Sequence, residues 1–355
     1  MADLKTRLSE ILDRLVGTRG VAGLAVVARP GLQPETVWVP SSSLAEPAFL
    51  AYSITKTFTA VLLLLLQEEG RLTLDNPLAR WFPRIVESER ISLRQLLNHT
   101  AGIPDYGPLR SYHEAVRTSP QTPWSFERFA AETFDKGLRF PPGTGWEYSN
   151  PAYMLLKRIA EEVSGTNYAA LVTERIARPL GLSRTFVPES LEGLASLAAA
   201  PSLALSPDGS PRDVRAYYHP GWVSHGVVAS TPSEIVRFLD ALFRGGLISH
   251  QSLDEMTALV PVSESSATDS QEAEPERSWS RPSYGLGLMG DPASPWGVVW
   301  GHNGGGPGYS ASAFHAPELG RVSVCAMTGI EDFQAEQLVF AVFDDHALDA
   351  TGSGA

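Results

Sequence analysis

Residues 51–70 read AYSITKTFTAVLLLLLQEEG and place a Ser-x-x-Lys pair directly in front of the most apolar run of the chain. The run predicts a helix that ends near Gly70, because glycine is the usual residue just beyond a helix C-terminus. Apolar residues surround this helix, so we expect it to be buried on every side. Ser53 and Lys56 should share one face at its N-terminal end, since residues three apart on a helix are neighbours.

A lysine at position 56 is unusual in this chain, which has four lysines among its 28 basic residues. A serine hydroxyl needs a base to take its proton before it can attack a substrate. A desolvated lysine can have its pKa lowered enough to be that base, whereas arginine stays protonated. Backbone N–H groups at the start of the helix can also face a developing oxyanion. The pair predicts a nucleophile and its base, although a bare Ser-x-x-Lys also arises by chance.

Two later segments carry polar residues in loops rich in glycine. PPGTGWEYSNPAY, residues 141–153, sets Tyr148 and Asn150 just before a helix that starts at Pro151. A phenol can relay a proton, and an amide can hold a substrate carbonyl. VVWGHNGGGPGYSASAF, residues 298–314, puts His302 at the end of an apolar strand, followed by glycines whose bare backbone can approach a ligand. Taken singly, the first segment is also typical of a helix cap and the second of a hairpin bend.

The remaining pattern predicts one sheet built from both ends of the chain. Strands are expected at 21–29 and 35–39 and, in succession, between 284 and 327, where RVSVCAM (321–327) alternates like a half-buried strand. Helices are expected at the N-terminus, at 151–165, at 231–246 and in the last segment from Asp332. We therefore predict an α+β fold, in which an antiparallel sheet of about five strands is flanked by the terminal helices and an all-helical domain is inserted.

The domain boundaries follow from this pattern. Residues 1–70 and 226–355 should form the discontinuous sheet domain, and 71–225 a helical domain with long loops. The stretch 263–282 is polar, acidic and without a period, so we expect a mobile surface loop there.

Charge and composition exclude several classes of protein. A net charge of −12 argues against a nucleic-acid partner and against an anionic membrane surface. The apolar run is roughly half the length that a membrane span requires. The first residues alternate charges with leucines as a surface helix does, unlike a signal peptide. A single cysteine rules out an internal disulfide, and we expect a cytoplasmic protein.

The order and spacing of the three motifs resemble the serine β-lactamase and penicillin-binding-protein superfamily. Ser-x-x-Lys comes first, Tyr-Ser-Asn follows 95 residues later, and His-Asn-Gly lies on a late strand. The similarity is greatest to the class C-like branch, which also holds D,D-carboxypeptidases, D-amino-acid amidases and esterases or transesterases. Segments such as ISLRQLLNHTAGIPDY (91–106) and SHGVVASTPSEIVRFLDALFRGG (224–246) extend the resemblance over about residues 20–345.

The resemblance implies a role for each motif residue. Ser53 would be the nucleophile that accepts the acyl group, and Lys56 its partner in proton transfer. Tyr148 would act as the base in acylation or as the acid to the leaving group, and the division of this work with Lys56 stays open. Asn150 would bind the acyl chain of the substrate and contact Lys56.

The third motif would complete the site. His302 would replace the lysine of the classical third motif, and Asn303 and Gly304 would follow it along the substrate. The backbone N–H of Gly305, with that of Ser53, would form the oxyanion hole.

Departures from the family pattern point to the substrate class. A histidine is only partly charged near pH 7, so recognition of a β-lactam or D-alanine carboxylate should be weaker. Asn303 stands where a hydroxyl residue usually binds that carboxylate. We therefore expect an esterase or amidase that acts on small, uncharged acyl compounds. The alternatives are a β-lactamase, a D-Ala-D-Ala carboxypeptidase or a D-aminopeptidase, then an acyltransferase and a non-catalytic binding module.

Other features predict no further chemistry. GLGLMG (285–290) matches a dinucleotide-binding pattern, but no helix pattern follows it. His219, His225 and His315 lack the spacing of metal ligands, and His99 is expected to be a hydrogen-bonded structural residue. We expect neither a cofactor nor a metal. Aromatic residues of YYHPGW (217–222), with Tyr106, Tyr112 and Trp124, line either a pocket mouth or the core. The small ester or amide substrate, the acceptor of the acyl group and the oligomeric state stay open.

Overall fold

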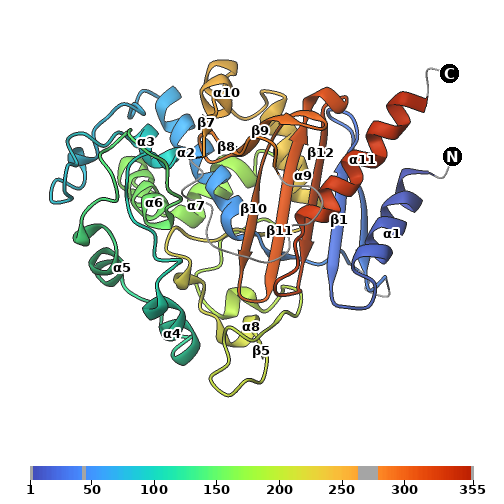
Figure 1. Cartoon of the computed structure of the whole chain (residues 1–355), viewed down its shortest axis with the longest axis horizontal. Coiled ribbons are helices and arrows are strands. Elements are labelled where there is room, and N and C mark those ends of the chain that lie inside the picture. Colours follow the sequence, from blue (N-terminus) through green and yellow to red (C-terminus); the bar gives the residue numbers. More distant parts are fainter. Residues whose placement is uncertain (1–2, 42–44, 263–278, 353–355) are drawn as a thin grey trace.

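A computed structural model of the chain describes residues 3–41, 45–262 and 279–352. Within these residues the main sheet is antiparallel and has eight strands in the order β2-β1-β12-β11-β10-β9-β8-β7. It takes strands from both ends of the sequence, as the sequence pattern predicts (Figure 1). The bounds are β1 Ala22–Val27, β2 Glu35–Val39, β7 Val260–Pro261, β8 Ser283–Tyr284, β9 Met289–Ser294, β10 Gly297–Gly306, β11 Tyr309–Ala316 and β12 Val322–Thr328.

Two apolar layers enclose the central strands. In β1, Leu24 and Val26 face one core, while Ala25 and Val27 face the other, as the two-residue period of a strand requires. The neighbouring strand β12 is buried along its whole length. The expectation that 321–327 form a half-buried strand was therefore wrong, because both faces of the sheet are covered.

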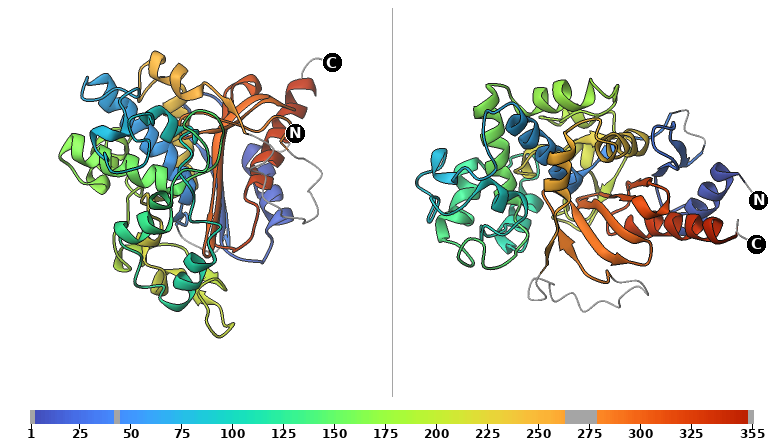
Figure 2. Two further views of the ribbon diagram at one scale, coloured as in Figure 1. Left: turned by 60° about the vertical axis from the view of Figure 1, so that its left-hand side comes forward. Right: turned by 90° about the horizontal axis from the view of Figure 1, so that it is seen from above.

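Different helices cover the two faces of the sheet (Figure 2). Helices α1 (Leu4–Leu15) and α11 (Glu336–Gly352) lie side by side on one face. Helix α9 (Pro232–Phe243) crosses the other face and begins at Thr231, whose side chain accepts a hydrogen bond from Glu234 N. The terminal helices thus flank the sheet, as predicted.

Apart from α9, the helices between residues 55 and 257 form the other side of the molecule, around α2 (Thr55–Glu68) and α6 (Asn150–Ser164) (Figure 1). Eleven of the 14 residues of α2 are buried, which confirms a helix enclosed on nearly all sides. The remaining bounds are α3 Leu93–Leu97, α4 Arg110–Thr118, α5 Phe126–Glu132, α7 Tyr168–Val172, α8 Val214–Tyr217 and α10 His250–Thr257, with short strands β3 Phe49–Leu50, β4 Pro201–Ser202, β5 Arg212–Asp213 and β6 Ala229–Ser230.

The sheet differs from the expected five strands mainly at its edge. Strands β7 and β8 have two residues each, too few to show a period in the sequence. Between β8 and β9, residues 285–288 leave the sheet and pack on α2, where Thr57 Oγ1 donates to Gly287 O at 2.8 Å. A Cβ on Gly287 would lie 2.6 Å from Lys56 O, so this close approach requires glycine.

Two further predictions concern the loop at 263–282 and the domain boundaries. Residues 263–278 of the expected mobile loop lie outside the described residues, and the domain boundaries at 70 and 226 stay a prediction. Among the described residues, no helix combines the length and the apolarity that a membrane crossing requires.

Candidate active site

Ser53 lies at the entrance to α2, in a single turn of 3-10 helix formed by Tyr52–Ile54. Tyr52 has a φ of 43°, a left-handed conformation that is costly for a tyrosine. Its hydroxyl donates to Pro307 O at 2.6 Å, and its ring packs where a Cβ on Gly306 would be. The turn that carries Ser53 is thereby held against the end of β10.

Lys56 is fully buried, and its amine lies among three polar atoms. The Nζ atom is 3.1 Å from Ser53 Oγ, 2.7 Å from Asn150 Oδ1 and 3.0 Å from His225 Nε2. Burial lowers the pKa of Lys56 to about 7, against the opposing charge of Asp105. A substantial fraction of the amine is therefore unprotonated near neutral pH and able to take a proton from Ser53.

Tyr148 and Asn150 reach the same point from the start of α6. Tyr148 OH donates to Ser53 Oγ at 2.7 Å, and burial raises the pKa of this phenol, which stays protonated at neutral pH. The backbone N of Asn150 donates to Asp105 Oδ1 at 2.9 Å, and its Nδ2 donates to Asp105 Oδ2 at 3.2 Å. The carboxyl group of Asp105 accepts both bonds and so turns the amide oxygen of Asn150 toward Lys56.

His99 supports the loop that carries Tyr148. Its Nδ1 accepts a hydrogen bond from Ser149 N at 3.2 Å, and its carbonyl accepts one from Glu147 N at 3.1 Å. Its ring centroid lies 4.5 Å from that of Tyr148. These contacts agree with a structural role for His99.

The neighbouring glycines Gly304 and Gly305 have different surroundings. A Cβ on Gly304 would lie 2.2 Å from Ala51 O and 3.1 Å from Ser53 N, so glycine is required for β10 to come this close. A Cβ on Gly305 would meet nothing within 4 Å. The first glycine brings the strand to the nucleophile turn, and the second borders open space.

Beyond Gly301, the edge of β10 beside Ser53 is no longer paired with β9. Asn303 N donates to Met289 Sδ at 3.5 Å, on the side of β10 that faces β9. Alternation along a strand sends the N–H of Gly305 toward the same side, and the pairing with β9 has already ended at Gly301. This geometry suits the N–H of Gly305 to an oxyanion hole with that of Ser53.

His302 is a neutral side chain in this site. Its Nδ1 lies 2.5 Å from Asn303 O, which can only accept, so Nδ1 carries the hydrogen and Nε2 accepts from Tyr284 OH at 2.8 Å. Burial lowers the pKa of His302 to about 3. The expectation of a partly charged histidine near pH 7 was therefore wrong, because the sequence does not show how completely the ring is buried.

The side chain of Asn303 points to the face of the sheet that α11 covers, opposite to the face that carries His302. Its Nδ2 donates to Glu336 Oε1 at 2.7 Å, and Trp279 Nε1 donates to the same oxygen at 3.0 Å. Burial raises the pKa of Glu336. A substrate carboxylate placed beside Asn303 would meet this second carboxyl group.

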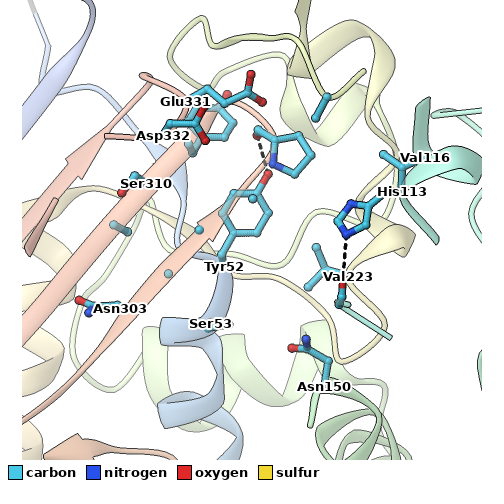
Figure 3. A pocket seen from close by; sticks show the side chains of 18 of the residues that line it. Tyr52, Ser53, His113, Val116, Asn150, Val223, Asn303, Ser310, Glu331 and Asp332 are labelled. Atoms are coloured by element: carbon cyan, nitrogen blue, oxygen red, sulfur yellow. Dashed lines mark hydrogen bonds between the residues drawn. The ribbon is translucent and has the colours of Figure 1, made fainter. Parts of the chain in front are cut away.

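A cavity of about 1310 Å³ opens in front of Ser53 (Figure 3). One side is the lysine cluster, defined as Ser53, Lys56, Tyr148, Asn150 and His225. The opposite side is the sheet wall, defined as His302, Asn303, Glu331, Asp332 and Glu336.

Aromatic side chains line another part of the cavity. Tyr106, Tyr112 and Tyr218 border it, while Trp124 and Trp222 pack against the ring of Tyr112. Both alternatives from the sequence therefore apply: the three tyrosines line the pocket mouth, and the two tryptophans pack in the core behind them.

The cavity brings together the side chains singled out from the sequence. Those lining it, or bonded to a lining residue, are Ser53, Lys56, Tyr148, Asn150, His302, Asn303, Gly304 and Gly305. Sequence reasoning missed four residues that contact them: Asp105, His225, Tyr284 and Glu336. None belongs to a spaced motif, and His225 stood out only as a histidine without ligand spacing.

The family model for Beta-lactamase matches residues 8–342. Among curated proteins, the chain is 28% identical over 304 residues to penicillin-binding protein 4* of Bacillus subtilis (strain 168), covering 81% of this chain and 62% of that protein. It is 29% identical over 204 residues to esterase EstB of Burkholderia gladioli, covering 51% of each. The chain thus spans between half and two thirds of the length of these relatives.

Among solved structures, the chain is similar to a D-stereospecific amidohydrolase from Streptomyces sp., with a TM-score of 0.80 and 29% identity over 96% of this chain and 98% of that one. It is also similar to the D-amino acid amidase from Ochrobactrum anthropi SV3 in complex with L-phenylalanine. That match has a TM-score of 0.77 and 25% identity over 99% of both chains. The fold is therefore the β-lactamase/transpeptidase fold, with the antiparallel sheet and the helices described above.

Proposed function

The chain belongs to the beta-lactamase family, and on that premise we propose that it is a serine hydrolase that forms an acyl ester on Ser53. One observation carries the proposal: a buried amine with a pKa of about 7 lies 3.1 Å from the hydroxyl oxygen of Ser53. An amine of ordinary pKa would be protonated at neutral pH and could not act as a base.

In acylation, neutral Lys56 takes the proton of the Ser53 hydroxyl while Oγ attacks the carbonyl carbon of the substrate. The negative charge that develops on the carbonyl oxygen is stabilised by the N–H groups of Ser53 and Gly305. Collapse of this intermediate breaks the bond to the leaving group, which takes a proton from Tyr148 or Lys56. The hydrogen bond from Tyr148 OH to Ser53 Oγ supports a shared role for the two side chains.

In deacylation, a water molecule adds to the carbonyl carbon of the ester and loses a proton to the same basic groups. Ser53 Oγ leaves and regains its proton, and the acid is released. An alcohol or an amine in place of water would make the protein an acyltransferase, the product then being a new ester or amide.

The sheet wall favours small acyl substrates without a carboxylate. His302 is neutral, Asn303 is bonded to Glu336, and Glu331 and Asp332 border the same cavity, so this wall repels a carboxylate, and the two arginines that line the cavity, Arg110 and Arg117, lie on α4 instead. Three of the similar proteins described above are, by name, an esterase, an amidohydrolase and an amidase. We therefore propose an esterase or amidase in preference to a β-lactamase.

A β-lactamase or D-Ala-D-Ala carboxypeptidase is the second candidate, because the chain is also similar to a penicillin-binding protein. Turnover of p-nitrophenyl butyrate should be compared with that of nitrocefin and of a D-Ala-D-Ala peptide. We expect the ester to be the better substrate by kcat/KM. A preference for nitrocefin would overturn the assignment.

A non-catalytic binding module is the remaining alternative. Covalent labelling by a fluorophosphonate, located by peptide mass spectrometry, tests for a reactive serine without knowledge of the substrate. We expect the label on Ser53 and none on the Ser53→Ala variant. A wild-type protein that resists the label would favour the binding module.

A further inference from the structure

His225 lies in the cavity at a position that the three motifs do not include. Its side chain is 1% exposed, and its Nε2 is 3.0 Å from Lys56 Nζ. Burial and the charge of Lys56 keep the pKa of His225 well below its usual range, so the ring is neutral. A neutral imidazole has one N–H and one lone pair, and either of them can face the amine.

The turn around His225 is fixed on both sides. Ser224 N donates to Tyr106 OH at 3.3 Å, and Val228 N donates to the side chain of Thr55, the first residue of α2, at 2.9 Å. Gly226 has a φ of 80°, and a Cβ there would lie 3.0 Å from the ring of Tyr168. The backbone is thus built to present His225 to the start of α2.

The contact with His225 determines which way the lone pair of the Lys56 amine points. A neutral amine has two N–H groups and one lone pair, and three groups surround it. Asn150 Oδ1 can only accept, because Nδ2 of the same amide donates to Asp105, so one N–H points there. One N–H and the lone pair remain for Ser53 Oγ and His225 Nε2.

The two tautomers of His225 give opposite results. If Nε2 carries the hydrogen, it occupies the lone pair of Lys56, and the amine can only donate to Ser53. If Nε2 accepts, the second N–H of Lys56 points to His225, and the lone pair faces the Ser53 hydroxyl. Only the second arrangement lets Lys56 take the serine proton.

We propose that His225 is a positioning residue that accepts a hydrogen bond from Lys56 and thereby directs the lone pair of the amine to Ser53 Oγ. The inference rests on the proposed function. After proton transfer, the three N–H groups of the ammonium ion meet Ser53 Oγ, Asn150 Oδ1 and His225 Nε2, so that each hydrogen has an acceptor. His225 therefore holds the base before the transfer and the conjugate acid after it.

Other charged or titratable groups also act on Lys56. The groups facing or coupled to the amine are Asp105, Tyr148, Tyr153, His99 and His302. Of these, Asp105 favours the ammonium form by its charge, whereas the tyrosines and the two histidines are neutral near pH 7. The hydrogen bonds of Nζ in the described residues go to Ser53, Asn150 and His225, so these other groups act on the amine through charge and packing and do not replace the effect of His225.

The test is the rate of fluorophosphonate labelling of Ser53 between pH 5.5 and 9 in the full-length protein. His225→Phe removes the acceptor, and we expect the plateau rate to fall at least roughly tenfold, part of what a positioned base contributes. The midpoint of the profile should move to lower pH, because the ammonium form loses a charge-assisted hydrogen bond.

His225→Gln and His225→Asn form a matched pair that keeps the position polar. Gln can place an amide oxygen near the position of Nε2, whereas the Asn side chain is one methylene shorter. We expect Gln to restore most of the rate and the midpoint, and Asn to resemble Phe. This comparison decides the matter even if His225→Phe fails to fold in a thermal unfolding measurement.

Three outcomes would overturn the inference: Gln and Asn variants with equal profiles, a folded Phe variant with the wild-type rate and midpoint, or faster labelling after removal of the imidazole. The last result would mean that Nε2–H occupies the lone pair. Failure of the wild-type protein to be labelled would instead refute the proposed function, whatever the variants do.

Discussion

The lysine cluster and the sheet wall face each other across one cavity, but they are built in different ways. In the lysine cluster, hydroxyl, amine, amide and imidazole groups are hydrogen-bonded to one another, and Lys56 is fully buried. In the sheet wall, Asn303 is tied to Glu336, Glu331 accepts from Leu203 N, and Asp332 is exposed at the cavity. The first region is a closed hydrogen-bonded network suited to one reaction, whereas the second is acidic and suited to discriminating between substrates.

The largest loss of activity is expected when the nucleophile of the lysine cluster is removed. Ser53→Ala should lower kcat/KM for a p-nitrophenyl ester by roughly 10³-fold or more, as for other deletions of a nucleophile. The thermal unfolding midpoint should change little, because the methyl group still fits the turn. Residual turnover near the wild-type rate would place the nucleophile elsewhere.

Lys56→Arg separates the charge of the lysine cluster from its basicity. The guanidinium group stays protonated and cannot take the serine proton, so we expect a loss of roughly 10²–10⁴-fold in acylation rate. The measurement is burst or single-turnover kinetics with the ester. If this variant keeps most of the activity, the proton-transfer role of Lys56 is wrong.

The contact between the two regions can be tested at adjacent glycines. Gly304→Ala would put a Cβ 2.2 Å from Ala51 O and push the nucleophile turn aside. A displacement of about 1 Å can cost roughly 10²-fold in rate, and we expect a loss of that order in kcat/KM. Gly305→Ala is the comparison: it keeps the N–H, and its Cβ meets nothing within 4 Å, so the nucleophile turn stays in place and we expect a smaller loss, from crowding of the cavity alone. Equal losses in both variants would contradict this interpretation of the approach between β10 and α2.

The pH dependence should report on the lysine cluster alone. Lys56 must be unprotonated to act, so kcat/KM should fall as the pH drops through about 7, the pKa of the buried amine. Asp105→Asn removes the negative charge that raises this pKa, and the midpoint should move to lower pH by roughly one unit. A midpoint that moves upward, or a flat profile over this range, would show that another group limits the rate.

The smallest effect is expected on the sheet wall. Glu336→Gln keeps an oxygen that can accept from Asn303 and Trp279 but removes the acidic group. We expect a gain of a few-fold in kcat/KM for a D-Ala-D-Ala peptide relative to the neutral ester, since one charge near the site is worth about 1 kcal/mol. Glu10→Gln, on the exposed surface of α1 and outside the cavity, is the control and should leave this ratio unchanged. An equal change for both substrates would mean that Glu336 does not discriminate between them.

Local rules in the sequence were sufficient for much of the fold. Helix α2 follows from its apolar run and Gly70, α6 from Pro151 and Gly165, and α9 from Thr231. These signals are strong because caps and periods depend on residues within a few positions of one another. The two-residue strands of the sheet edge are too short to carry such a signal, and β7 pairs with β8 across more than twenty positions of the chain.

The sequence by itself determined that Ser53 and Lys56 are one helical turn apart, and that this pair precedes a buried helix, because both properties are local. Only the tertiary structure decided how basic the lysine is, since that depends on its burial and on Asp105. It also decided that His225 meets the amine and that His302 is neutral. The contact between Lys56 and His225 joins residues 169 positions apart, and the free energy of a charge depends on the whole environment that surrounds it.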